Sequence, residues 1–357
     1  PSSVTMNSSV NFPLNTLFAR YNQASSNNRF DTQEFLLWDG SESNNLEGIM
    51  ANINNYYSIH DTGLLVNYPG AVAAYSVRQL TSTVTASMSI RRSGSVGDNE
   101  ERVIGFTSNG DLDTGSIEAF CSGSEHGCYV STWHNQGSGG SIYDASNSTA
   151  LNQPQIYSGS AVITVNNKPA LKGGNLKWSP SNRIYYSGSF ANIVLVKQPR
   201  AETTWVFGSQ HSNNHQLSMN RFGTLNWRGG VSANPAWPYV YPNQTAATSP
   251  IVSTQDNQGG PITMDQQNLF IINNVYNTKT DVLLNGVDLA DNITYPTQSL
   301  PLDVVTAMGI YQLYNSAYSQ PITTDTFYQE MIMYPSSSIE SEKTAISNNI
   351  NSYFNIY

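Results

Sequence analysis

The sequence predicts an all-β protein, built as a two-sheet antiparallel β-sandwich. Short runs of alternating or apolar residues recur along the chain, and clusters of Gly, Asn, Ser and Pro separate them. The stretch LLNGVDL is a strong hairpin signal, because Asn285-Gly286 can take the positive φ angles that a type I′ turn requires. Long helical patterns are almost absent. Many strands at short spacing therefore indicate a sandwich or a barrel.

Six runs illustrate the strand pattern most clearly. Each is short, alternating or apolar, and each is bounded by residues that favour turns. The runs are AVITVNN, ANIVLVKQ, TTWVFGS, NLFIINNVYN, DVLLNGVDL and FYQEMIMYP.

Two short amphipathic helices are predicted, at about 338–354 and at about 44–58. In the C-terminal helix, Ser337 or Ser338 can cap the N-terminus. Both helices place apolar residues on one face at helical spacing. These residues are Ile339, Ile346, Ile350 and Phe354 in the C-terminal helix and Leu46, Met50, Ile53 and Tyr57 in the other.

The two helices end two copies of a repeated unit. NINSYFNIY at 349–357 nearly repeats NINNYYSIH at 52–60, and the likeness extends upstream to QEMIMYPSSSIES and QEFLLWDGSES. A strand, a turn and a short helix therefore occur twice. We predict an N-terminal segment at 1–62, which serves as a docking or assembly element, and a main β-sandwich at 63–357.

Composition excludes several classes of function. Charged residues make up 11% of the 357 residues, far below the usual value of about 25%, and aromatic residues also make up 11%. Because disordered chains have high charge and few aromatics, this chain is expected to fold. The net charge of -9 argues against nucleic-acid binding, and Arg91-Arg92 is the only tight basic cluster. No apolar run approaches the ~20 residues of a membrane span, so no membrane insertion is expected.

The two cysteines lie close together in AFCSGSEHGCYV. Glycines in this loop allow Cys121 and Cys128 to approach each other, which predicts a local disulfide worth about 2–3 kcal/mol. Such a bond suits an extracellular or otherwise oxidising location. Two free thiols are the alternative. No metal site is expected, because a single cysteine pair with only His126 nearby lacks ligands.

One turn offers a weak cation site and no other cofactor is expected. GDLDTG places Asp111 and Asp113 in a turn that could hold Ca²⁺ together with backbone oxygens. A plain polar turn is the favoured interpretation.

The stretch from residue 73 to residue 156 resembles a known family. It contains AAYSVRQL, then CYVSTWHNQGSGGSIYDAS, then NQPQI. This order resembles a concanavalin A-like jelly-roll family, the catalytic module of fungal-type α-L-arabinofuranosidases (glycoside hydrolase family 54), and related modules of bacterial and phage proteins. There a TWYDQSG-like motif precedes a QP strand. The closing TFYQEMIMYPSSSIESEKTAISNNI also resembles the family's last strand and helix, and the middle of the chain resembles it least.

The resemblance implies a sandwich with a concave face that often holds carbohydrate. Analogy with Asn-rich, charge-poor members implies an extracellular or virion-surface structural protein, such as a spike, fibre or capsid-associated protein. The implied partners are a cell-surface or extracellular glycan and other copies of the chain or other structural proteins.

The resemblance also implies a glycosidase as an alternative. Such an enzyme needs two carboxylates about 5–5.5 Å apart for retention or about 6.5–9.5 Å apart for inversion. The family's acidic residue before its last strand has its counterpart near Leu313 or Tyr314, where no carboxylate stands. Asp325 and Glu330 are the fallback acids. The chain is therefore expected to be non-catalytic.

Sugar binding requires aromatic faces for the apolar side of the ring and polar groups for its hydroxyls. In SANPAWPYVYPNQ, prolines hold Trp237, Tyr239 and Tyr241 in a stiff segment that cannot pair as a central strand. Sugar binding, subunit contact and loop packing are all open for these three. Trp227 and Arg228 are further candidates.

Trp133, with His134 and Asn135, is another aromatic candidate. It follows the apolar run YVST, and its family counterpart is a core position, so packing is the favoured role.

Three functions remain open at this stage. The first is a non-catalytic extracellular or virion protein that binds carbohydrate in adhesion. The second is a glycoside hydrolase of arabinofuranosidase type, and the third is a purely structural assembly subunit.

Overall fold

The computed structural model divides the chain into two units, Pro1–Ile53 and Asn54–Tyr357. Almost everything that it describes belongs to the second unit. Of the predicted helix at about 44–58 only Ile49 is described, and it is helical. The rest of the predicted N-terminal segment, 1–62, lies outside the described residues. Those residues are 49, 63–94, 99–178, 183–184, 190–197, 204–209, 215–219, 225–229, 265–275, 279–293, 305–306, 308–310, 326–336 and 338–357.

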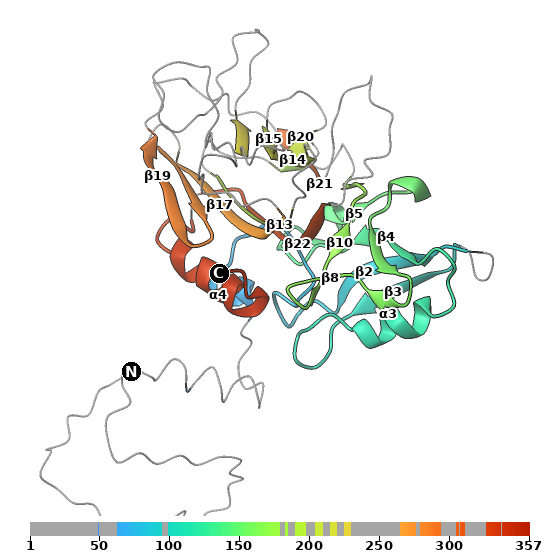
Figure 1. Cartoon of the computed structure of the whole chain (residues 1–357). Helices are drawn as coiled ribbons and strands as arrows, with labels where there is room; N and C mark the ends of the chain where they lie inside the picture. The colour runs from blue at the N-terminus through green and yellow to red at the C-terminus, as the bar shows by residue number, and fades with distance from the viewer. Residues whose placement is uncertain are drawn as a thin grey trace, which may run out of the picture. The chain divides into compact units, whose positions relative to one another are not determined.

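Most described strands of the second unit are linked into one antiparallel network of two parts, named the first and second sheets, which confirms the predicted all-β sandwich (Figure 1). In the first sheet the strands run β19–β18–β17–β13–β22, and β1 and β10 share the far edge of β22. Its central strands read as nearly continuous apolar runs because both of their faces are buried. The bounds are β1 Ala73–Ser76, β10 Leu171–Lys172, β13 Phe190–Lys197, β17 Gln267–Val275, β18 Lys279–Leu284, β19 Val287–Ile293 and β22 Phe327–Tyr334.

The second sheet runs β3–β2–β4–β5–β11–β21–β14–β15–β16. β6 pairs with the start of β4 and with β7, and β10 pairs with β6 as well as β22, which joins the two sheets at one edge. The bounds are β2 Ala86–Arg92, β3 Glu101–Gly105, β4 Cys128–Trp133, β5 Ala145–Ser146, β6 Gln155–Ser158, β7 Ala161–Val162, β11 Leu176–Lys177, β14 Thr204–Ser209, β15 His215–Met219, β16 Leu225–Gly229 and β21 Met308–Ile310.

Two short strand pairs stand apart from these sheets. β8 (Thr164–Val165) pairs with β9 (Lys168–Pro169), and β12 (Arg183–Ile184) pairs with β20 (Val305–Thr306). The predicted single strand AVITVNN is therefore divided between β7 and β8.

The core between the sheets is built on large aromatic side chains. Tyr75 on β1 lies 5.7 Å from Trp133 on β4 and 6.3 Å from Trp178, measured between ring centroids. Trp133 is fully buried, and its indole N–H donates to the Ser76 carbonyl across the core. The predicted packing role of Trp133 is therefore confirmed.

The predicted hairpin at Asn285-Gly286 joins β18 to β19. Both residues have positive φ, 49° and 79°, as a type I′ turn requires. A side chain at Gly286 would be strained at this φ and would also approach the Tyr357 hydroxyl within 2.8 Å.

The C-terminal helix α4 spans Lys343–Phe354, so it begins five residues later than the predicted start at 338. The residues before it form turns, in which the Glu342 N–H bonds the Ile339 carbonyl 2.9 Å away. The predicted serine cap is therefore wrong, and Glu342 stands at the N-cap instead. The predicted apolar face is confirmed, because its members are all buried. They are Ile339, Ile346, Ile350 and Phe354.

Two helices were missed by the sequence analysis. α2 spans Leu64–Asn67, and α3 spans Thr114–Cys121 where the pattern indicated only a polar turn. Asp113 starts α3 because its carboxylate accepts the Ser116 N–H at 3.0 Å, which satisfies a free donor of the first turn. Two 3-10 turns, η1 (Gly140–Tyr143) and η2 (Ala150–Asn152), lie between β4 and β6.

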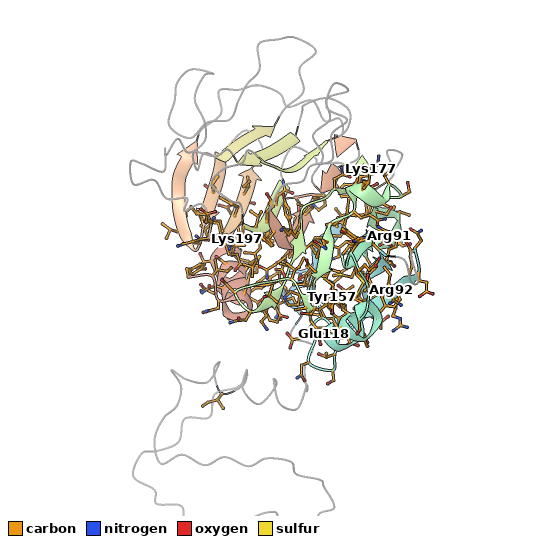
Figure 2. All side chains as sticks on the ribbon, turned by 45° about the vertical axis from the view of Figure 1, so that its right-hand side comes forward. Arg91, Arg92, Glu118, Tyr157, Lys177 and Lys197 are labelled. Atoms are coloured by element: carbon orange, nitrogen blue, oxygen red, sulfur yellow. A yellow bond between two sulfur atoms is a disulfide. The ribbon has the colours of Figure 1, made fainter. Side chains whose placement is uncertain are left out.

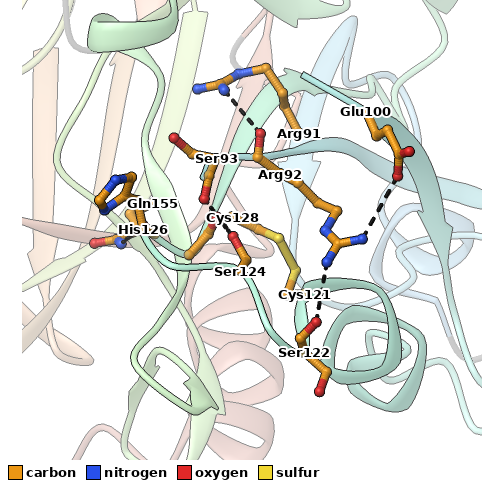
Figure 3. Close-up of a disulfide and its surroundings, with 11 residues drawn as sticks. Arg91, Arg92, Ser93, Glu100, Cys121, Ser122, Ser124, His126, Cys128 and Gln155 are labelled. Carbon is orange, nitrogen blue, oxygen red and sulfur yellow. Dashed lines mark hydrogen bonds and ion pairs between the residues drawn. A yellow bond between two sulfur atoms is a disulfide. The ribbon is translucent and has the colours of Figure 1, made fainter. Parts of the chain in front are cut away.

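A disulfide joins Cys121, at the end of α3, to Cys128, at the start of β4 (Figure 3). Both cysteines are fully buried. The loop between them is fixed to the end of β2 by Ser124, whose hydroxyl donates to the carbonyl of Ser93, the residue after the strand, at 2.6 Å. Arg92 donates to the Ser122 carbonyl at 3.2 Å, which makes a second tie.

Candidate functional site

A β-bulge in β4 determines which side chains reach the outer face of the second sheet. Val130 and Trp133 are three residues apart, yet both are fully buried, which strict alternation forbids. The pairing of β2 with β4 shifts between Ser89↔Thr132 and Ile90↔Val130, so Ser131 is the extra residue. The bulge turns Trp133 into the core and leaves Thr132 and His134 on the opposite face.

Strand pairing then sets out two rows of side chains on this outer face. Residues directly opposite each other in antiparallel strands share a face, with Cβ atoms about 4.5–5.5 Å apart. The first row crosses five strands and is at least partly exposed throughout. Its members are Val103, Ser89, Thr132, Ser146 and Lys177. The second row contains Glu101, Arg91, Tyr129 and Gln155.

Polar and aromatic groups in the second row are held in place by short contacts. The Arg91 guanidinium lies 5.5 Å from the centroid of the Tyr129 ring, within cation–π range. Its Nε donates to the Gln153 side chain at 2.8 Å. Figure 2 labels Arg91, from β2, and Lys177, from β11, on the right-hand side of the view.

Three side chains from separate elements form a hydrogen-bonded line that starts in the first row, at Ser89. The Ser89 hydroxyl lies 3.0 Å from His134 Nε2, and His134 Nδ1 lies 2.8 Å from Asp144 Oδ2. Ser89 is on β2, His134 follows β4, and Asp144 follows η1. The His134 and Asp144 side chains are each 22% exposed, so solvent reaches the line.

The motif HNQG fixes the loop that carries this line. The Asn135 side chain accepts the Ala74 N–H at 2.7 Å and donates to the Gly140 carbonyl at 3.0 Å. Gln136 accepts the Leu80 N–H at 2.8 Å. The stretch that carried the family resemblance therefore ties the loop after β4 to the segment around β1.

Glu330, one of the two fallback acids, forms a buried ion pair. It is 1% exposed, and its carboxylate accepts from Arg78 Nε at 2.8 Å and Nη2 at 3.0 Å. The Ser76 hydroxyl donates to the same carboxylate at 2.7 Å. Arg78 also donates to the Asn349 side chain at 2.9 Å, which connects β22 to α4. These contacts are typical of a structural pair. Asp325 lies outside the described residues.

The predicted aromatic binding residues fall mostly outside the part of the chain that the structure describes. Trp237, Tyr239 and Tyr241 lie there entirely. Trp227 and Arg228 belong to β16, opposite Leu217 and Gln216 of β15, and only their backbone is described.

The two carboxylates considered for calcium both have protein partners. Asp113 caps α3, and hydrogen bonds from the Ser116 hydroxyl and N–H lower the pKa of Asp113. Asp111 accepts from the Tyr353 hydroxyl at 2.5 Å and from Lys168 at 3.3 Å. Within the described ranges, no three His, Cys, Asp or Glu side chains gather as a metal site would require. None of the described helices is long and apolar enough to cross a membrane.

Sequence analysis missed Ser89 and Asp144 as site residues. No local motif joins them, because Ser89 precedes His134 by 45 residues and the two meet only through the pairing of β2 with β4. Asp144 stands ten residues after His134, and the turn η1 brings the chain back so that the two side chains meet. The one sequence signal for this site was the three-residue spacing of the apolar residues Val130 and Trp133. It indicates a bulge in the strand, and the bulge puts His134 on the face opposite Trp133.

Comparison with solved structures finds weak likenesses. A glycoside hydrolase family 54 α-L-arabinofuranosidase soaked with a cyclic sulfate inhibitor aligns with a TM-score of 0.48 at 14% identity, over 78% of this chain and 62% of that one. Trypanosoma rangeli sialidase in complex with sialic acid gives 0.37 at 12%, over 86% and 40%. The binding domain of botulinum neurotoxin serotype D gives 0.36 at 8%, over 61% and 49%. The chain thus spans less than two thirds of each.

The family suggested by the sequence resemblance is thus among the structures to which this chain is similar. No family model and no curated protein matches the sequence.

Proposed function

We propose that the chain binds saccharides on the outer face of its second sheet and acts outside the cell in adhesion. The observation that carries this proposal is the first row, in which pairing places Ser89, Thr132 and Ser146 side by side. Hydroxyls at strand spacing provide donors and acceptors for the hydroxyls of a sugar. Tyr129, in the adjacent row, adds a partly exposed aromatic ring that can contact the apolar side of a sugar.

The first sheet is less suited to a ligand. The described side chains of β13, β17 and β22 are almost all buried, so they do not present a free polar row. Along β2 and β4 of the second sheet, by contrast, partly exposed residues recur among the buried ones. The disulfide between Cys121 and Cys128 supports an oxidising location, as on an extracellular surface.

Glycosidic-bond cleavage is not part of this proposal. It needs one carboxylic acid and one carboxylate that face the same bond. Glu330 instead faces Arg78 in the interior. A spike, fibre or capsid-associated role remains a hypothesis from the sequence.

The test compares glycan-array binding of the whole chain with that of a Tyr129→Ala, Thr132→Val variant. Loss of the ring contact and of one hydroxyl contact is expected to weaken binding about tenfold or more. Val287→Ser, on the exposed tip of the β18–β19 hairpin, is the matched control and should bind as the wild type does. Undiminished binding by the double variant would refute the outer-face site.

A separate variant tests the loop predicted from the sequence. Trp237→Ala with Tyr239→Ala should leave glycan binding intact if the outer face is the site. Loss of glycan binding in this variant alone would place the saccharide site in that loop. Failure of self-assembly in it, with no glycan bound by the wild type, would favour the assembly subunit.

A further inference from the structure

The line from Ser89 through His134 to Asp144 has the connectivity of an activated nucleophile. An ionised carboxylate only accepts hydrogen bonds, so Asp144 fixes the proton of the neutral imidazole on Nδ1, 2.8 Å away. His134 Nε2 is then an acceptor, and the Ser89 hydroxyl donates to it at 3.0 Å. A nucleophile, a base and a group that orients the base stand in this order in hydrolases on unrelated folds.

The base and its orienting group are rigidly placed. The second oxygen of Asp144, Oδ1, accepts the Asn135 N–H at 2.8 Å, so the carboxylate cannot turn freely. The backbone N–H of His134 donates to the Ser87 carbonyl at 2.8 Å, which holds this residue, and with it the imidazole, beside β2. Pre-organised geometry of this kind is what a general base requires.

The surroundings of Ser89 suit a small acyl group. Its neighbour on β3 is Val103, which is 60% exposed and presents an apolar surface. Its neighbour on β4 is Thr132, which is partly exposed and whose hydroxyl can donate a hydrogen bond. An ester carbonyl over Ser89 would therefore have an apolar group on one side and a donor on the other.

We propose that this chain hydrolyses short-chain carboxylic esters at the outer face of the second sheet. Ser89 and His134 are the catalytic residues, and Asp144 is a positioning residue. The inference goes beyond saccharide binding and does not rest on it, because the reaction needs only the acyl group and its ester bond. It departs from the non-catalytic role expected from the sequence, and it involves neither fallback acid.

The reaction proceeds in two balanced steps. Ser89 Oγ attacks the ester carbonyl carbon while its proton passes to His134 Nε2, and the Thr132 hydroxyl donates to the carbonyl oxygen as it gains charge. The C–O bond then breaks, and the alcohol leaves with the proton from His134. Water next attacks the acyl-Ser89 and gives its proton to His134. The bond between the acyl carbon and Ser89 Oγ then breaks, His134 returns its proton to Ser89 Oγ, and the carboxylic acid departs.

The test measures 4-nitrophenyl acetate hydrolysis and labelling by a fluorophosphonate with the whole chain. Ser89→Ala should lower turnover about 100-fold or more and abolish the adduct, which peptide mass analysis should place on Ser89 in the wild type. Ser158→Ala, which removes an exposed hydroxyl at the end of β6 and outside both rows, is the matched control and should retain wild-type turnover and labelling.

Asp144→Asn tests the positioning role separately. The amide oxygen can still accept the Asn135 N–H, so the loop should be preserved. The amide N–H₂ would face Nδ1 and move the imidazole proton to Nε2, where it blocks proton transfer from Ser89. We expect kcat to fall about 100-fold with KM unchanged, since only the chemical step is affected.

Three results would overturn the proposal. They are wild-type turnover no faster than buffer, turnover in Ser89→Ala equal to wild type, and an adduct on a residue other than Ser89. If Ser89→Ala fails to fold, the site of the wild-type adduct and its loss in Asp144→Asn decide the question.

Discussion

The buried ion pair between Arg78 and Glu330 yields the sharpest stability prediction. Replacing Glu330 by Ala removes the acceptor of two guanidinium hydrogen bonds, at 2.8 and 3.0 Å, and of the Ser76 hydroxyl bond at 2.7 Å. The Arg78 side chain is only 9% exposed, so its charge is left without a partner in a site poor in water. Breaking a buried pair in this way costs about 3–5 kcal/mol.

The reverse change should cost a similar amount and adds one loss. Arg78→Met leaves the Glu330 carboxylate buried and also removes the 2.9 Å bond to Asn349. The guanidinium contacts with the Tyr353 and Phe354 rings, at 5.1 and 5.6 Å, are lost as well. These cation–π contacts are worth about 0.5–2 kcal/mol.

A double variant separates the pair from its surroundings. Arg78→Met with Glu330→Met removes both charges, so its cost should be well below the sum of the single costs, because neither charge remains unpaired. Urea unfolding at pH 7 of the wild type, the two single variants and the double variant gives the free energy of unfolding of each, and hence the coupling energy of the pair. A Glu330→Ala cost below about 1 kcal/mol, or a double cost equal to the sum, would refute the assigned role of the pair.

Three other changes test local features of the second sheet and its loops. Cys121→Ser with Cys128→Ser should lower the free energy of unfolding by about 2.5 kcal/mol in urea titrations without reductant, and an unchanged midpoint would contradict the estimate. Asp113→Ala should cost about 1 kcal/mol in thermal melts at pH 7. Hydrogen bonds from Ser116 lower the pKa of Asp113 below its ordinary 3.8, so this cost should persist down to that value and vanish as the pH falls further; a cost unchanged in strong acid would argue against it. Asn135→Ala leaves the Ala74 N–H unpaired and should cost about 1–3 kcal/mol in urea unfolding, whereas a cost near zero would mean that the loop closes without it.

The strands of the first sheet could be predicted because their signals are local. The FII and IVLV runs are apolar and rich in β-branched residues, which indicates strands buried on both faces. The burial of Ile346, Ile350 and Phe354 follows equally from helical spacing. The start of α4 did not follow, because turns before Lys343 also bury Ile339.

The missed helix α3 shows a limit of local patterns. Thr114–Cys121 contains a glycine and a serine, which weaken helix propensity, so the stretch reads as a turn. The structure supplies what the pattern lacks, since Asp113 caps the helix and Ile117, Phe120 and Cys121 are buried. Packing of an apolar face stabilises short helices more than propensity does.

The candidate site could not be predicted because one residue decides its geometry. If Ser131 were paired regularly and formed no bulge, alternation after Val130 would turn His134 into the core and Trp133 outward. The sequence marks Trp133 as a core residue but contains no sign of its partner strand. Ser89 becomes the neighbour of His134 only through the register of β2 with β4, which long-range packing sets.

Two acidic side chains, Glu330 in the first sheet and Asp144 beside the second, have different expected roles, the first in stability and the second in the proposed chemistry. Glu330 lies in the first sheet, where its carboxylate is satisfied by Arg78 and Ser76 and has no contact with the outer face. Asp144 lies beside the second sheet, partly exposed, and orients an imidazole that faces a hydroxyl. Substitution of Glu330 should therefore change unfolding but not ester turnover per folded molecule. Asp144→Asn should do the reverse, and any exchange of these two effects would show that the functional acid lies in the first sheet.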